Sequence, residues 1–209
     1  MYKVDLHTHS FHSGDNDADP EEMIYKAIQV GLDGIAFTEH YYYEASGFVE
    51  RLKTKYNNRL MLFRGVEFSA LEGHCLVFGI DTDKVISKHC PITELINIVN
   101  ERGGVVIPSH PYRGFNSVGD KLLELKKITA IEVYNGANMR LMNTKALDVA
   151  KSLNIPYTGG SDAHSAIDVG SCYTLFEKRL NNDNIVQLLN SGQYKGYDNR
   201  RFAFTQNQR

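Results

Sequence analysis

The segment YKVDLHTHS (residues 2–10) joins a predicted strand to a pair of histidines. Its first part, YKVDL (2–6), alternates apolar and polar residues as a half-buried strand does. Side chains at positions i and i+2 of a strand point to the same face, so His7 and His9 can reach one metal ion. Asp5 shares that face and is expected to accept an imidazole N–H. The segment therefore predicts a metal site at the end of the first strand.

Strand and helix patterns alternate along most of the chain. Apolar, β-rich runs predict strands at 2–6, 34–37, 60–68, 75–80, 103–107, 130–134 and 155–159, with a further edge or late strand at 171–176. Helical patterns occur at 20–31, 91–102, 118–127, 138–153 and 182–191. This alternation predicts an α/β fold with a parallel sheet, either open or closed into a barrel.

The composition is that of a globular domain. The chain has 209 residues, of which 42% are hydrophobic, so we expect one domain over 1–209 whose last part, 191–209, is a polar, solvated tail. The 25 acidic and 23 basic residues give a net charge of −2, which does not indicate a membrane or nucleic-acid surface. No apolar run approaches the roughly 20 residues of a membrane span. Three cysteines without CxxC spacing suit a reduced compartment, so a cytoplasmic protein is expected, in an oligomeric state that the sequence leaves open.

Potential ligands occur where predicted strands end. They are His7, His9, His40, Glu67, His110, Asp162 and His164, whereas Glu132 lies inside a predicted strand and His74 opens one. In parallel α/β folds the C-terminal ends of the strands meet on one face, where active sites are built. These residues are therefore expected to converge. A single histidine near a strand end is more often a core or surface residue, and that interpretation is preferred for His89 and His12.

Other catalytic patterns are missing or fail. The run DNDAD (15–19) begins like a calcium loop, but Pro20 and Lys26 stand where that loop needs Gly and Glu. The chain has no GxxxxGK[ST], no GxGxxG after a strand and no GxSxG. Cys75 follows His74 directly, and neighbours on a strand point to opposite faces, so a Cys–His nucleophile pair is not expected.

Four motifs resemble those of the PHP (polymerase and histidinol phosphatase) family of metal-dependent phosphoesterases. They are DLHTHS (5–10), TEH (38–40), GVEFS to GHCLVFGID (65–81), and SHP (109–111) with GGSDAH (159–164). The resemblance covers about residues 1–175. It implies a distorted (β/α)7, TIM-like barrel with the metal site at the C-terminal strand ends. It also implies two or three divalent ions, of zinc, manganese or iron.

The resemblance also implies a ligand set. The first ion would be held by His7, His9, Glu67 and Asp162, and the second by His74 and His110, with Glu67 bridging the two. His40 and His164 would hold a third ion with a residue from the loop after His9. His12, Asp15 and Asp17 compete for that position, and Asp15 is preferred.

Further residues are candidates for contact with the substrate or for proton transfer. Arg113 lies three residues after His110 and is expected to bind phosphate oxygens, with a surface arginine in a turn as the alternative. Asn135, in EVYNG, is a second substrate-binding candidate. His40 and His164 are also candidate catalytic residues that transfer a proton, a role that sequence does not separate from metal binding.

The function implied by the resemblance is hydrolysis of a phosphoester by a metal-activated hydroxide. Clustered divalent ions can generate the nucleophile and neutralise the charge of the phosphate. A small phosphorylated substrate is expected, a monoester such as histidinol phosphate. Within the family the alternative is a nuclease or nucleotide phosphodiesterase, although only the tail and KLLELKK (121–127) hint at the basic groove that nucleic acid needs.

Two further classes stay open. An amidohydrolase barrel also begins with His-x-His, but eight strands and often a bridging lysine are expected of it. A PHP module without catalysis is the other, and loss of metal ligands would be its sign. All but one of the expected ligand positions are plainly filled in this chain, so an enzyme is favoured.

Overall fold

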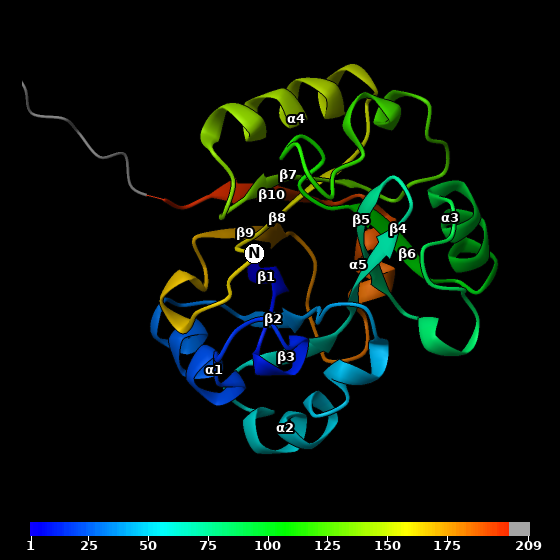
Figure 1. Cartoon of the computed structure of the whole chain (residues 1–209). Helices are drawn as coiled ribbons and strands as arrows, with labels where there is room; N and C mark the ends of the chain where they lie inside the picture. Colours follow the sequence, from blue (N-terminus) through cyan, green and yellow to red (C-terminus); the bar gives the residue numbers. More distant parts are fainter. Residues whose placement is uncertain (201–209) are drawn as a thin grey trace, which may run out of the picture.

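Strand β1 (Tyr2–Thr8), which carries the first histidines, lies at the centre of a five-stranded sheet. The computed structural model describes residues 1–200 of the chain (Figure 1). The strand order is β10-β9-β1-β2-β3, with β2 (Gly34–Phe37) and β3 (Met61–Arg64) running parallel to β1. On the other side, β9 (Cys172–Phe176) is antiparallel to both β1 and β10 (Tyr194–Asp198).

Two smaller sheets complete the β structure of residues 1–200. The first contains β4 (Val66–Ala70), β5 (Gly73–Phe78) and β6 (Val105–Pro108), all antiparallel. The second pairs β7 (Ile131–Asn135) with β8 (Tyr157–Gly160) in parallel. Isolated bridges from Thr8 to Ala163 and from His40 to Glu67 join the ends of the sheets. The three sheets therefore meet where the predicted ligands lie.

Helices cover the outside of the strands (Figure 1). They are α1 (Pro20–Gln29), α2 (Val49–Tyr56), α3 (Ile92–Glu101), α4 (Arg140–Ser152) and α5 (Ile185–Ser191). Short 3-10 turns occur at Phe11–Ser13, Tyr43–Ser46, Thr82–Lys84, Gly119–Leu123 and Ala166–Asp168. In Figure 1, α4 lies over β7, while α1 and α2 lie beside β2 and β3. None of the helices within 1–200 is long and apolar enough to cross a membrane.

Helix α1 shows how local sequence sets these elements. Asp19 accepts a hydrogen bond from the Glu21 N–H at 2.7 Å and so caps the helix, while Pro20 occupies the first turn. Met23 and Ala27, one turn apart, are fully buried against β2 and its neighbours. The predicted start of this helix is confirmed.

The α/β class is confirmed, but the predicted parallel sheet is only partly present, because parallel and antiparallel pairs are mixed. Strands β4, β5 and β6 are antiparallel, as are the pairs that β9 makes. The pairing within 1–200 gives three sheets rather than one continuous ring, so the (β/α)7 barrel stays a prediction. The predicted strand 60–68 is two strands interrupted at Gly65, where a Cβ would lie 2.6 Å from the Phe78 ring. The chain turns there from one sheet into the next.

Two further predictions about local structure were wrong. The segment 118–127 was predicted to be a helix but contains only the 3-10 turn Gly119–Leu123. Gly119 and Lys127, near the two ends of the segment, both have positive φ, which an α-helix does not allow. The start of the predicted solvated tail forms β10, and Arg200 donates hydrogen bonds to the carbonyls of Gly136 and Asn138. The rest of that tail, 201–209, lies outside the described residues.

Replacing Gly196 with alanine tests whether β10 is a packed strand. A Cβ at this position would lie 2.3 Å from the Thr158 carbonyl oxygen in β8, so the two backbones would have to separate. We expect the free energy of unfolding to fall by about 2 kcal/mol, as for an overpacked core. Lys195→Ala, at the exposed neighbouring position, should change it by less than about 0.5 kcal/mol in the same urea titrations. Equal stability of the two variants would contradict the packed strand.

Candidate metal centre

The predicted ligands lie together at the ends of the strands. They come from β1 and the loop after it (His7, His9, Asp15), the segment after β2 (His40), β4 (Glu67), β5 (His74), and the segments after β6 (His110) and β8 (Asp162, His164). Three groups have ligand atoms within 4.8 Å of one another: His7, His9 and Asp162; His40, Glu67 and His74; and His9, His40 and His164. Residues separated by up to 157 positions thus share one cluster.

The Glu67 carboxylate is the centre of the cluster. It is 1% exposed. Its Oε1 lies 2.8 Å from His110 Nε2, 3.3 Å from His7 Nε2 and 3.4 Å from His74 Nδ1. Its Oε2 lies 3.1 Å from His40 Nδ1 and 3.5 Å from His9 Nε2. Five imidazoles therefore face the two oxygens of one carboxylate, an arrangement in which Glu67 can bridge two cations.

Three ring nitrogens that face this cluster are buried and lack a hydrogen-bond partner within residues 1–200: His7 Nε2, His9 Nε2 and His40 Nδ1. The first two lie 3.4 and 3.3 Å from the same Asp162 oxygen, Oδ1. Buried polar atoms normally have partners, and a divalent cation would supply one to the nitrogens of His7 and His9. The donor set of the cluster therefore fits metal ions.

Electrostatics prepares the cluster for a cation. Burial raises the pKa of Glu67, but the neighbouring imidazoles, His7 first, lower it well below its ordinary value. Burial also raises the pKa of Asp162, but His7 and His9 together hold it well below its ordinary value. Burial lowers the pKa of His9 to about 4, so its imidazole is neutral. Ionised carboxylates beside a neutral imidazole are what a divalent metal ion binds.

The prediction that Asp5 accepts an imidazole N–H was wrong. His7 Nδ1 lies 2.8 Å from an oxygen of Glu132, not of Asp5. The carboxylate of Asp5 instead accepts backbone N–H groups of Ser161 and Gly170 at 2.8 and 2.9 Å, and burial raises its pKa to about 6. The side chain that orients His7 is Glu132, whose other oxygen accepts the His110 N–H at 2.9 Å. The signal available in the sequence for Glu132 was a carboxylate inside a predicted, buried strand.

A second network orients His9 and His40. The Ser13 hydroxyl lies 3.2 Å from His9 Nδ1, accepts the His40 N–H at 3.1 Å and donates to Glu39. Burial raises the pKa of Glu39 to about 7 despite its hydrogen bonds from Ser10 and Ser13. Sequence analysis gave neither Ser13 nor Glu39 a role. Glu39 stands directly before His40 in TEH, and its partners come from the loop after β1.

The loop after β1 contributes Asp15 to the cluster. Its Oδ2 lies 3.1 Å from His40 Nε2 and 3.2 Å from His164 Nε2. The ring of His12 instead stacks on Phe48, with 4.3 Å between centroids. Among the three competing residues Asp15 is the one beside both histidines. This group is the more exposed part of the cluster, because the Asp15 and His164 side chains are 42% and 38% exposed.

Arg113 points into the cluster. Its guanidinium donates to the Asp162 carboxylate, to Asn135 Oδ1 at 2.9 Å and to Asn138 Oδ1 at 2.9 Å. Asn135 in turn donates to Asp162 Oδ2 at 3.1 Å and to Glu132 at 3.0 Å. Both substrate-binding candidates therefore lie at the edge of the ligand set, in contact with one of its carboxylates. Asn138 joins them, and sequence analysis did not single it out.

The chain is similar in sequence to a family model and to a protein from an archaeon. The family model PHP_C, described as PHP-associated, matches residues 140–194. The uncharacterized protein MJ1587 of Methanocaldococcus jannaschii is 26% identical over 144 residues, which cover 64% of this chain and 81% of that protein.

Solved structures extend the comparison to the whole fold. PsfC from Pseudomonas syringae has a TM-score of 0.71 at 21% identity, covering 94% of this chain and 92% of that chain. A proposed metal-dependent phosphoesterase from Bifidobacterium adolescentis has a TM-score of 0.64 at 18% identity, with coverages of 89% and 95%. An amidohydrolase from Chromobacterium violaceum has a TM-score of 0.62 at 18% identity, with coverages of 80% and 89%. At these identities the likeness concerns the fold. The PHP-associated family model and the four sequence motifs agree with the resemblance to the PHP family.

Proposed function

We propose that this chain is a metal-dependent phosphoester hydrolase. The observation that carries the proposal is the buried Glu67 carboxylate, which faces five imidazoles and can bridge two cations. Divalent ions bound there would supply a nucleophile near neutral pH and neutralise charge on the phosphoryl oxygens. The fold likeness to a protein described as a phosphoesterase agrees with this proposal.

Each group of the cluster has a role in the proposal. His7, His9 and Asp162 would hold one ion with Glu67, and His74 and His110 would hold a second on the other side of Glu67. His40, His164 and Asp15 would hold a third ion or serve a proton. Imidazole and carboxylate ligands without thiolates suit zinc, manganese or iron. Since the third group is the more exposed, its ion would be the most easily lost.

Two residues of this chain would act on the substrate directly. Arg113 carries a positive charge at the edge of the cluster and would bind phosphate oxygens, and Asn135 keeps it there through its side-chain oxygen. His164 Nδ1 lies 3.0 Å from the backbone oxygen of Asp162, two residues earlier, and its Nε2 faces Asp15 at the open side. From there His164 would protonate the leaving oxygen if it holds no metal ion.

The alternatives fit the cluster less well. An amidohydrolase commonly bridges its ions with a lysine, whereas a glutamate lies at the bridging position here. A nuclease needs free basic residues, but Lys121 pairs with Glu72 and Lys145 with Asp120. A non-catalytic module would have lost ligands. In this chain all but one of the expected positions are plainly filled, and Asp15 lies beside His40 and His164 where the remaining one is expected.

The proposal is tested by hydrolysis of simple chromogenic phosphomonoesters and phosphodiesters, with added manganese or zinc and after chelation. We expect monoester turnover that chelation abolishes. His7→Ala should lower the number of bound metal ions and the turnover together, because its free nitrogen faces Glu67 and Asp162. Circular dichroism would confirm the fold of the variant. Full turnover by His7→Ala, or no turnover of either ester with metal bound, would sink the proposal.

Replacing Glu132 with glutamine tests the orienting contact to His7. The amide cannot accept from His7 Nδ1 as the carboxylate does while also accepting the His110 N–H. We expect the dissociation constant of the tighter metal ion to rise about 10-fold or more, as for other partners of metal-bound histidines. Calorimetric titration with zinc measures it. The control is Glu177→Gln, which replaces a carboxylate at an exposed position and should leave the dissociation constant unchanged. Equal dissociation constants in the two variants would show that Glu132 does not orient His7 for metal binding.

Replacing Arg113 with alanine tests its contact with phosphate. If the guanidinium binds ground-state phosphate, KM should rise about 10-fold while kcat changes less, which corresponds to about 1.4 kcal/mol. Arg102→Ala, at an exposed position after α3, is the matched control. Metal content has to be measured in parallel because Arg113 also contacts Asp162. An unchanged KM with full metal content would show that Arg113 does not bind the phosphate.

A further inference from the structure

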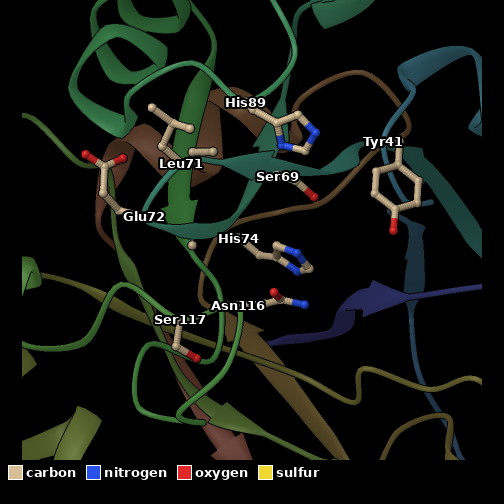
Figure 2. A pocket seen from close by; sticks show the side chains of 10 residues that line it. Tyr41, Ser69, Leu71, Glu72, His74, His89, Asn116 and Ser117 are labelled. Atoms are coloured by element: carbon tan, nitrogen blue, oxygen red, sulfur yellow. The ribbon is translucent and has the colours of Figure 1, made fainter.

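A pocket of about 380 Å³ opens directly beside the metal centre (Figure 2). Its lining residues are Tyr41, Ser69, Ala70, Leu71, Glu72, Gly73, His74, His89, Asn116 and Ser117. Sites for small molecules commonly have volumes of about 300–1,000 Å³. His74 belongs both to this pocket and to the ligand cluster around Glu67. A group bound here would therefore continue from a phosphate held at the metal ions.

The walls of the pocket are fixed by the metal ligands themselves. Ser69 lies two residues after Glu67 on β4, on the same face, and is paired with His74 across the sheet. The backbone oxygen of Asn116 accepts the His74 N–H at 3.0 Å. The Ser117 hydroxyl donates to the His110 oxygen at 2.8 Å. The pocket is thus held in register with the cluster on several sides.

The pocket offers neutral polar groups that have no partner in the described part of the chain. Ser69 Oγ is buried and makes no hydrogen bond. The Asn116 side-chain amide makes none either, and Figure 2 shows it directed toward His74. Tyr41, which is 52% exposed, and His89 contribute aromatic rings on the side away from Glu72. Tyr41, His89 and Asn116 all have positive φ, which fixes unusual directions for their side chains.

Charge limits what this pocket can hold. Glu72 is the one carboxylate in the lining, and it pairs with Lys121 and accepts the Ile92 N–H at 2.7 Å. An ammonium group would find no free carboxylate among these lining residues. No lysine or arginine lines the pocket, so a second phosphate would be unpaired as well. The group that fits this pocket is therefore uncharged, forms hydrogen bonds and has a planar ring.

We propose that this pocket binds a nucleoside, so that the phosphoester cleaved at the metal centre is a nucleoside monophosphate. The inference rests on the proposed function and names its substrate class. Asn116 presents a donor and an acceptor that match the edge of a purine. Tyr41 offers a ring face on which a base can stack. An amino alcohol such as histidinol, the sequence-based expectation, carries the ammonium that this pocket leaves unpaired.

The experiment compares adenosine 5′- and 3′-monophosphate with ribose 5-phosphate, which lacks the base. The wild-type protein should hydrolyse one nucleotide with a kcat/KM at least about 30-fold above that for ribose 5-phosphate. Asn116→Ala and Tyr41→Ala should each reduce this ratio by about 10-fold, since the first removes a hydrogen bond to the base and the second removes the stacking face. Tyr25→Ala, an equally exposed tyrosine on α1, is the matched control and should keep the ratio.

Binding of adenosine alone gives a readout that does not depend on turnover. Calorimetry should detect adenosine binding to the wild-type protein, and Asn116→Ala should weaken it about 10-fold. Faster cleavage of a terminal phosphate on an adenosine oligonucleotide would support the base pocket and assign it to strand ends. Equal kcat/KM values for nucleotide and ribose 5-phosphate, with no adenosine binding, would overturn the pocket proposal while leaving the hydrolase proposal standing. Adenosine binding without any ester turnover would do the reverse.

Discussion

The buried charge of Glu67 is the constraint on which the rest of the site depends. A carboxylate with 1% exposure costs several kcal/mol to desolvate unless opposite charges or hydrogen bonds compensate it. Here the compensation comes from Ser109, which donates at 2.7 Å, and from five imidazoles. Their effect exceeds that of burial, since the pKa of Glu67 is held well below its ordinary value. The strands must therefore bring distant histidines to one point for the carboxylate to be stable at all.

Close backbone packing makes that convergence possible. At Gly160, the last residue of β8, a Cβ would lie 2.5 Å from the His7 Cβ, so only glycine lets β8 approach β1. His110 and Asp162, each just after a strand, have φ of 32° and 54°. Such conformations cost of order 1–3 kcal/mol in non-glycine residues and persist where the surroundings impose them. The fold thus accepts local strain in order to place His110 beside Glu67 and Asp162 beside His7 and His9.

Much of this cluster could be predicted because its candidate metal ligands lie at or just after the ends of strands. The i, i+2 rule puts His7 and His9 on one face, and the ends of β1, β2 and β6 carry histidines. What sequence could not give is pairing between distant segments. The run 60–68 has no internal signal, apart from Gly65, that it changes sheet, and β10 depends on its antiparallel pairing with β9 and on the close approach of Gly196 to β8. Likewise, choosing Glu132 over Asp5 as the partner of His7 required the register of β7.

The site divides into two halves with opposite chemistry. Around Glu67 nearly every group is charged or faces a charge, which suits cations and phosphate. Beyond His74 the lining is neutral, because Lys121 already pairs with Glu72. A phosphoester has the same division, with a charged phosphate joined to its leaving group. In the proposed hydrolase the neutral half would therefore select among leaving groups that metal ions do not distinguish. In the proposed hydrolase, specificity would therefore depend on Asn116, Tyr41 and Ser69 rather than on the candidate metal ligands.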